Sequence, residues 1–321
     1  MTSIRGRTQT PIRAKNIIPY LLLGTFLGSL AGCEVAGVGT PLPDPTLAAP
    51  NEQSAESLAL TSYYGRVQDG LLTQGLLRQD GGGPDVPFTQ RNLVDNFVRI
   101  AMFDEYTNIG GRIVARQTAS KLDKWRDPIR MQVEFGDSVD VDQRLQDSSD
   151  IAHYAARLSR ITGLPIRQVR TGANFHVFVV NEDERRAMAP RIREILPGIN
   201  EAALNTVIAM PRSTFCLVFA LDPGNDGSYS QALAIIRGEH PNLMRLSCIH
   251  EEIAQGLGLS NDSAAARPSI FNDDEEFGLL TNHDEMLLRM LYDPRMLPGM
   301  DADAARVQAE VIAAELLAGQ S

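Results

Sequence analysis

The sequence has few cysteines and few histidines, and it has no excess of positive charge. Among 321 residues there are three Cys and five His, and 40 acidic residues outnumber 30 basic ones. The net charge of −10 argues against nucleic acid as a partner. The sequence also lacks a phosphate-binding loop, a dinucleotide-binding glycine fingerprint and a Gly-x-Ser-x-Gly elbow. Nucleotide binding and serine-hydrolase chemistry therefore have no support from motifs.

Residues 1–32 have the layout of a secretion signal. Four basic residues precede an uncharged, mostly apolar stretch at 17–30, which is too short for a comfortable membrane-spanning helix. Residues 30–33 read Leu-Ala-Gly-Cys, the pattern of a bacterial lipobox. This predicts that Cys33 is the lipidated N-terminus of the mature protein. An ordinary secretion signal, or a membrane helix with a chance cysteine, is the alternative.

A lipid on Cys33 would anchor the protein to a lipid bilayer, facing the periplasm of the bacterial cell envelope. Glu34 in place of aspartate slightly favours the outer membrane over the inner one. Removal of residues 1–32 takes away four basic residues and no acidic ones, so the net charge falls from −10 to −14. Residues 33–55, rich in Pro, Ala, Gly and Thr, predict a flexible linker behind the anchor.

Two cysteines remain after Cys33, at positions 216 and 248. An even pair in an oxidising compartment predicts a disulfide between Cys216 and Cys248. The alternative is two separately buried thiols, because separation in sequence says nothing about distance in space.

The rest of the chain divides into a helical segment at 56–84, one domain at 85–300 and a helical tail at 301–321. Within the domain, residues 92–103 read as a helix or an extended segment. Hydrophobic periodicity predicts strands at 128–135, 175–180, 215–221 and 232–236, and helices at 148–162, 183–196 and from about 246. This β-α-β-α-β-β order predicts an α+β fold.

The most informative stretch is EEIAQGLGLSND at residues 251–262. His250 does not begin a His-Glu-x-x-His zinc helix, because the residue four positions later is Ala254. If the motif is instead aligned to begin one residue later, at Glu251, the stretch has the spacing of the longer zincin motif, His-Glu-x-x-His-x-x-Gly-x-x-His. In this register the general-base position keeps Glu252. The three metal-ligand positions hold Glu251, Gln255 and Asn261, and the motif turn holds Gly258 and Asp262.

The sequence downstream supports the same register. Residues 269–272, Ser-Ile-Phe-Asn, resemble the Met-turn of metzincins, with Phe271 in place of the methionine. Residues 280–292 resemble the closing helix of such domains, with Thr281 as N-cap and Asp284 as its capping-box partner.

The lipobox, the 251–262 stretch and these two downstream segments together resemble the bacterial family described as domain of unknown function 2927. The resemblance covers about residues 85–300. It implies a zincin-like, metallopeptidase-like fold with a mixed sheet and an active-site-type helix, and it assigns no activity.

The chemistry of the three ligand positions does not favour zinc. One carboxylate and two amides bind zinc poorly, although such oxygen ligands suit calcium, which is not excluded. Without a metal ion, Glu252 has no activated water to use. No cofactor and no confident metal site are predicted. A site made of His250 and His283 is disfavoured, and the acidic run at 272–276 reads as a solvated loop.

Helical geometry indicates a role without a metal ion for the ligand positions Glu251 and Gln255. Leu246, Ile249, Ile253 and Leu257 form an apolar stripe, and Glu251 and Gln255 lie on the other side of the helix. They would then line a polar face or a cleft.

Two functions remain open. The first is a binding or structural module that has lost zinc and peptidase activity, a pseudoenzyme whose cleft takes an extended peptide or an envelope protein. The second is a metal-dependent peptidase or amidase with non-standard ligands, acting on peptide or cell-wall substrates. Either could pair its ligand with a sheet edge, for which residues 232–236 are the candidate.

Overall fold

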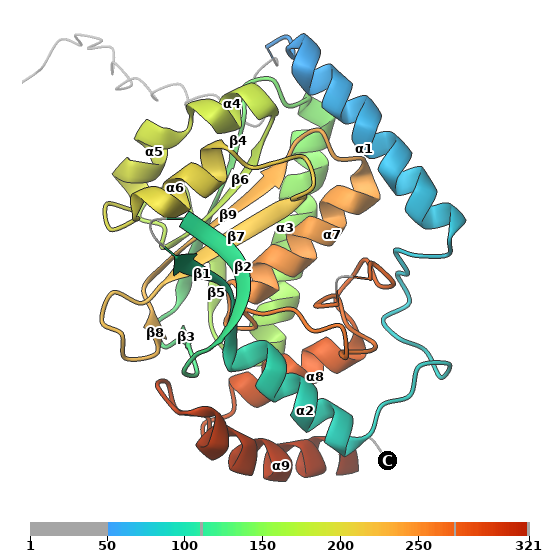
Figure 1. Ribbon diagram of the computed structural model, residues 1–321, viewed down its shortest axis with the longest axis vertical. Coiled ribbons are helices and arrows are strands. Elements are labelled where there is room, and N and C mark those ends of the chain that lie inside the picture. Colours follow the sequence, from blue (N-terminus) through green and yellow to red (C-terminus); the bar gives the residue numbers. More distant parts are fainter. Residues whose placement is uncertain (1–50, 110–111, 273, 320–321) are drawn as a thin grey trace, which may run out of the picture. The chain divides into compact units, whose positions relative to one another are not determined.

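The computed structural model describes residues 51–109, 112–272 and 274–319, and it describes no side chains for 105–117. A five-stranded sheet with the strand order β5-β4-β6-β9-β7 lies at its centre (Figure 1). These strands are β4 (Ile129–Phe135), β5 (Ile166–Gln168), β6 (Phe175–Val180), β7 (Cys216–Leu221) and β9 (Gln231–Arg237). The mixed helix and sheet content confirms the predicted α+β class.

Four strands of this sheet are parallel, and β7 is antiparallel to its neighbour β9. The prediction that residues 232–236 form the sheet edge is wrong, because β9 lies between β6 and β7. All five of these residues have no exposed surface. A continuous apolar run of this kind is typical of an inner parallel strand covered on both faces. In the part of the chain that the structure describes, the edge strand on this side is β7 instead.

Helices cover both faces of the sheet (Figure 1). The long α3 (Val141–Thr162) and α7 (Asn242–Gln255) pack on one face, and the short α4 (Glu182–Ala187), α5 (Ala189–Ile195) and α6 (Glu201–Ile208) pack on the other. Side chains of β6 alternate between two hydrophobic clusters, since successive residues of a strand point to opposite faces. Val177 and Val179 join the cluster under α3 and α7, whereas Phe178 and Val180 join the cluster under α4–α6.

Several boundaries differ from the prediction for local reasons. The predicted helix at 183–196 is two helices, because the chain breaks at Met188 and Pro190 starts the first turn of α5. Helix α3 begins seven residues before the predicted start at 148, at a polar turn capped by the Asp140 side chain. Helix α7 begins directly after Pro241 rather than near 246.

The C-terminal part packs helices against the end of this core. Helix α2 (Gln90–Ala101) contacts α8 (Asn282–Leu291) and α9 (Ala302–Ala318). Residues 92–103, which the sequence left between helix and extended chain, are thus mostly helical. A hairpin of β1 (Phe103–Ile109) and β2 (Arg112–Ala119) follows α2, and β2 contacts α6. A short parallel pair joins β3 (Lys124–Trp125) to β8 (Ser228–Tyr229).

Helix α1 (Ala55–Thr73) is tied to the domain by polar contacts at both ends of its buried face. The Ser57 hydroxyl donates to the Glu239 carboxylate (2.9 Å), and the Tyr64 hydroxyl donates to the carbonyl of Arg212 (3.0 Å). These contacts place the segment that follows the predicted linker directly on the folded core.

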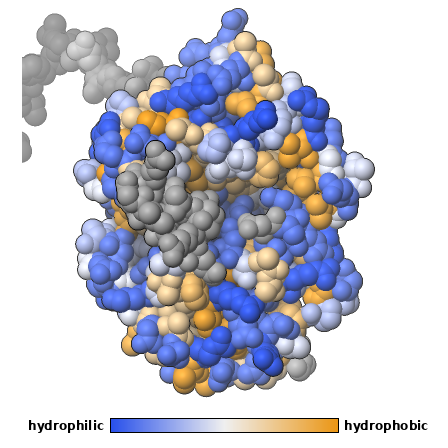
Figure 2. All heavy atoms as spheres, viewed as in Figure 1, coloured by the Kyte–Doolittle hydropathy of each residue, from blue (hydrophilic) through white to orange (hydrophobic). Residues whose placement is uncertain are grey.

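The surface in the view of Figure 2 is mainly hydrophilic, with hydrophobic residues in small separate patches. Within the described part of the chain, no helix has both the length and the apolar character needed to cross a membrane. The predicted signal at 1–32, Cys33 and nearly all of the linker at 33–55 lie outside the described residues.

Candidate functional site

Helix α7 carries the predicted motif and separates its apolar and polar residues as the spacing predicts. Of the predicted apolar stripe, Ile249, Ile253 and Leu257 have no exposed surface and belong to the main hydrophobic cluster, whereas Leu246 is half-buried and lies outside that cluster. Glu251 and Gln255 lie on the other side and line a groove. Because the apolar stripe holds one side of α7 against the core, the polar side faces this groove.

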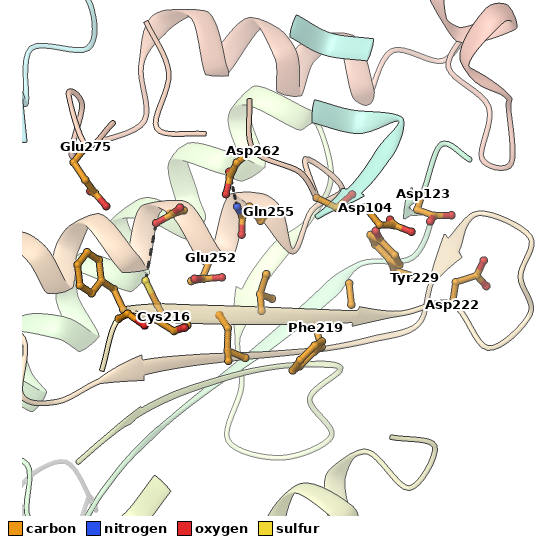
Figure 3. Close-up of a pocket in the computed structure, with 18 of the residues that line it drawn as sticks. Asp104, Asp123, Cys216, Phe219, Asp222, Tyr229, Glu252, Gln255, Asp262 and Glu275 are labelled. Carbon is orange, nitrogen blue, oxygen red and sulfur yellow. Dashed lines mark hydrogen bonds between the residues drawn. The ribbon is translucent and has the colours of Figure 1, made fainter. Parts of the chain in front are cut away.

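The groove lies between α7 and the edge strand β7 and has a volume of about 660 Å³ (Figure 3). Helix α1 adds Val67 and Leu71 to its wall, and residues 213–220 run along its floor. Seven of its lining residues are acidic: Asp104, Asp123, Asp222, Glu251, Glu252, Asp262 and Glu275. Among the lining residues that the structure describes, none is Lys, Arg or His. The groove is therefore strongly negative in composition.

The end of α7 determines which motif residues meet. The Gln255 side-chain amide donates to the Asp262 carboxylate (Nε2–Oδ1 3.0 Å). The Asn261 side chain instead is buried and donates to the carbonyls of Arg99 (2.7 Å) and Asp262 (2.8 Å). Among the three predicted ligand positions, Glu251 and Gln255 thus share the groove, and Asn261 does not line it.

Gly258 permits the turn that brings Asp262 back toward Gln255. Its φ is +120°, a conformation that side-chain-bearing residues rarely adopt. A Cβ at this position would lie 2.2 Å from the carbonyl oxygen of Asp123. The glycine predicted from the motif is therefore required both by the backbone angle and by close contact with a neighbouring segment.

A disulfide joins β7 to α7, the two elements between which the groove lies. Cys216 at the start of β7 is bonded to Cys248 in α7, with 5.9 Å between their Cα atoms, so the predicted pairing is confirmed. The Glu251 carboxylate lies 4.0 Å from the Cys216 sulfur. The cross-link fixes α7 beside the edge strand at the end where Glu251 lies.

The side chains in the groove do not fit a zinc ion. Ligand-type atoms of Cys216, Glu251 and Glu252 lie within 4.8 Å of one another. However, the Cys216 sulfur is in a disulfide and supplies no thiolate. The carboxylates of Glu251, Glu252 and Asp262 and the amide of Gln255 then remain at this end of the groove, without the imidazole or thiolate ligands that protein zinc sites mostly use.

A second group of acids, which no sequence motif indicated, lies at the other end of the groove. Asp104, Asp123 and Asp222 gather there with Tyr229 (Figure 3). Burial, with a smaller contribution from the nearby carboxylates of Asp104 and Asp222, raises the pKa of Asp123 to about 6. Burial also raises the pKa of Asp104. Because the three acids come from β1, the segment before β3 and the turn after β7, no local spacing could reveal them.

The predicted Met-turn segment is packed inside the domain. Phe271 has no exposed surface and belongs to the main hydrophobic cluster. The buried Asp284 carboxylate accepts hydrogen bonds from the Ser269 hydroxyl (2.6 Å) and the Ile270 amide (3.0 Å). The Phe271 carbonyl accepts from the amide of Ser263 (2.8 Å), next to Asp262. The turn thus supports the segment that follows α7.

The two histidines of the disfavoured metal site have separate partners. His250 stacks on Tyr154, with 4.0 Å between ring centroids, and its Nδ1 accepts from the amide of Leu280 (3.2 Å). Burial, with a smaller effect of Arg157, lowers the pKa of His250 to about 3. The Nε2 atom of His283 lies 3.1 Å from the Asn96 side-chain nitrogen. Both rings have structural roles in the interior.

The acidic run at 272–276 is only partly solvated, unlike the predicted loop. Glu276 forms ion pairs with Arg267 (2.5 Å) and Arg78 (3.2 Å), and Glu275 lines the groove. Asp274 is exposed, and Asp273 lies outside the described residues. The local sequence did not show that arginines from two other segments meet this run.

Fold and site together define a mixed α+β domain with an acidic groove between a helix and an antiparallel edge strand. The chain belongs to the family described as "Protein of unknown function (DUF2927)", whose model matches residues 90–310, more than half of the chain. Comparison with curated proteins and with solved structures gave no match.

Proposed function

We propose that this protein is an envelope-anchored lipoprotein whose zincin-like domain binds extended peptide segments and does not act as a zinc peptidase. The observation that carries the proposal is the acidic groove between α7 and the free edge of β7. A free edge strand recognises an extended chain through its backbone groups, which requires no metal and no catalytic residue.

Three features support the zincin-like part of the proposal. Helix α7 presents Glu252, at the general-base position, and the ligand positions Glu251 and Gln255 to the groove. An antiparallel edge strand runs beside this helix. The turn at Phe271, at the position of a Met-turn, holds the residue after Asp262 through a backbone hydrogen bond.

The chemistry of the donors supports the loss of peptidase activity. A zinc peptidase uses the metal to activate water, and Glu252 then acts as the base on that water. The groove offers carboxylates and an amide where the motif would have three imidazoles. We therefore assign Glu252 a role in the shape and charge of the groove.

Metal analysis of the purified protein, combined with a peptide-cleavage assay, tests this proposal. We expect no stoichiometric zinc and no cleavage, with identical results for the wild type and Glu252→Gln. Stoichiometric zinc together with cleavage that Glu252→Gln abolishes would overturn the proposal in favour of the metal-dependent peptidase or amidase. The variant Asp127→Asn, which changes an exposed acid outside the groove, is the matched control.

The anchor is tested separately. Cys33→Ser should abolish incorporation of labelled fatty acid and move the protein from the membrane fraction to the soluble fraction. A Cys33→Ser protein that still carries the label, or that stays with the membranes after a high-salt wash, would contradict the lipoprotein part of the proposal.

A further inference from the structure

The edge of β7 opens into the groove. Residues 213–220 line it, and among the described residues β9 is the only strand that pairs with β7. A strand at a sheet edge presents unpaired backbone N–H and C=O groups, which can bond to an added extended chain. The backbone of β7 therefore offers pairing, and the side chains around it select which chain is bound.

The acidic residues of the groove lie in two groups at the two ends of β7 (Figure 3). The helix group lies near Cys216, the first residue of β7, since the Glu251 carboxylate is 4.0 Å from the Cys216 sulfur. This group consists of Glu251, Glu252, Asp262 and Glu275.

The strand-end group lies at the other end, because Asp222 directly follows Leu221, the last residue of β7. It consists of Asp104, Asp123 and Asp222. Between the two groups the groove is lined by strand side chains such as Val218 and Phe219.

The distance between the groups matches an elongated ligand rather than a single ion. Strand β7 has six residues, and at about 3.3 Å per residue its two ends are roughly 17 Å apart. A chain that adds to β7 as a strand would pass the two groups at positions about five residues apart. The apolar side chains between the groups would then face uncharged residues of that chain.

We infer that the groove binds an extended cationic peptide segment, which pairs with β7 and places one set of Lys or Arg side chains at the helix group and a second set at the strand-end group. This inference rests on the proposed peptide-binding function and adds the chemistry of the partner. Opposite charges across an interface favour the correct partner and fix its register, and like charges exclude anionic chains.

Binding of fluorescent peptides to the full protein tests the inference. The main probe is a peptide of about ten residues with a Thr/Val centre and a Lys pair at each end. Three matched probes replace both Lys pairs by Glu, replace them by Ser, or place proline in the centre, which removes a backbone donor. We expect the Lys peptide to bind at least about ten-fold more tightly than the Glu peptide, and more weakly as salt is raised. The proline peptide should lose most of the affinity.

Variants of the two groups locate the charges. Glu251→Gln and Asp123→Asn should each weaken the binding of the Lys peptide by roughly three- to ten-fold, whereas Asp127→Asn should leave its affinity unchanged. For a peptide that lacks one Lys pair, one of the two variants should no longer change the affinity, and the other variant should still weaken it. The peptide series uses the unmodified protein, so the test stands even where a variant is poorly folded.

The outcomes separate the inference from the proposed function. Equal affinity for the Lys and Glu peptides, or no effect of Glu251→Gln and Asp123→Asn, overturns the cationic partner and leaves peptide binding intact. Equal affinity for the proline peptide overturns pairing with β7. If none of the Lys, Glu and Ser peptides binds, the proposed function itself is wrong.

Discussion

The Gln255 amide donates a hydrogen bond to the Asp262 carboxylate across the end of α7 (3.0 Å). In the zincin-like register, Gln255 holds the second ligand position, and Asp262 directly follows Asn261, which holds the third. Asn261, at the third position, turns away to the carbonyl of Arg99. The residue that completes the polar side of α7 in the groove is thus Asp262.

This geometry predicts where a zinc site could be built. Glu251→His with Gln255→His places two imidazoles four residues apart on the groove side of α7, and the native Asp262 can act as a third ligand. We expect this double variant to bind about one zinc per chain in calorimetry, unlike the wild type. Adding Asp262→Asn should weaken zinc binding by about ten-fold or more, and adding Asp127→Asn should not. Zinc affinity that is indifferent to Asp262→Asn would contradict the geometry.

The Cys216–Cys248 disulfide predicts a loss of stability when both cysteines are replaced by serine. The bond closes a loop with a sequence separation of 32 residues. Its removal should lower the free energy of unfolding by about 3 kcal/mol, measured by urea denaturation. A reductant should destabilise the wild type by a similar amount and leave the serine variant unchanged. Equal stability of the oxidised wild type and the variant would show that the cross-link contributes little.

Replacement of Asp284 should be among the most damaging single changes. Its carboxylate has no exposed surface and accepts bonds from Ser269, Ile270 and both the amide and hydroxyl of Thr281. Asp284→Ala leaves the Ser269 hydroxyl and the amides of Ile270 and Thr281 without this acceptor, so we expect a loss of about 3–5 kcal/mol in urea denaturation. Asp127→Ala, at an exposed position, should change stability by less than about 0.5 kcal/mol. A small effect of Asp284→Ala would mean that the turn at 269–271 is held by other contacts.

His250 should make the protein less stable in acid. Burial lowers its pKa to about 3 in the folded protein, whereas an unfolded histidine has a pKa of about 6.5. Below about pH 6.5 the unfolded state therefore binds a proton that the folded state does not. The contribution of His250 to stability is therefore greatest above this pH and falls toward pH 3, with a slope of about 1.4 kcal/mol per pH unit.

The variant His250→Asn measures that contribution, because its side-chain oxygen can still accept from Leu280. Its free energy of unfolding, followed between about pH 6 and pH 4.5, should fall less steeply than that of the wild type. The variant His153→Asn, which replaces an exposed histidine instead, is the matched control. Parallel slopes for the wild type and His250→Asn would refute the prediction.

Local patterns predicted much of the fold. Residues 175–180 form β6 with the predicted limits, because a short apolar run between turns has few alternatives to a buried strand. The apolar stripe of Leu246, Ile249, Ile253 and Leu257 predicted which side of α7 is buried, although its first residue, Leu246, is only half-buried. No local pattern predicted the β1–β2 hairpin.

The sequence by itself determined the features that depend on neighbours along the chain: the lipobox at Cys33, which stays a prediction, the cysteine pair, and the polar side of α7 with Glu251 and Gln255. Only the tertiary structure decided that β7 and not β9 forms the sheet edge, that Asp262 and not Asn261 faces Gln255, and that Asp104, Asp123 and Asp222 share one end of the groove. These features depend on how strands far apart in the sequence pair and on which segment packs beside the end of a helix. The spacing of residues along the chain does not indicate such long-range contacts.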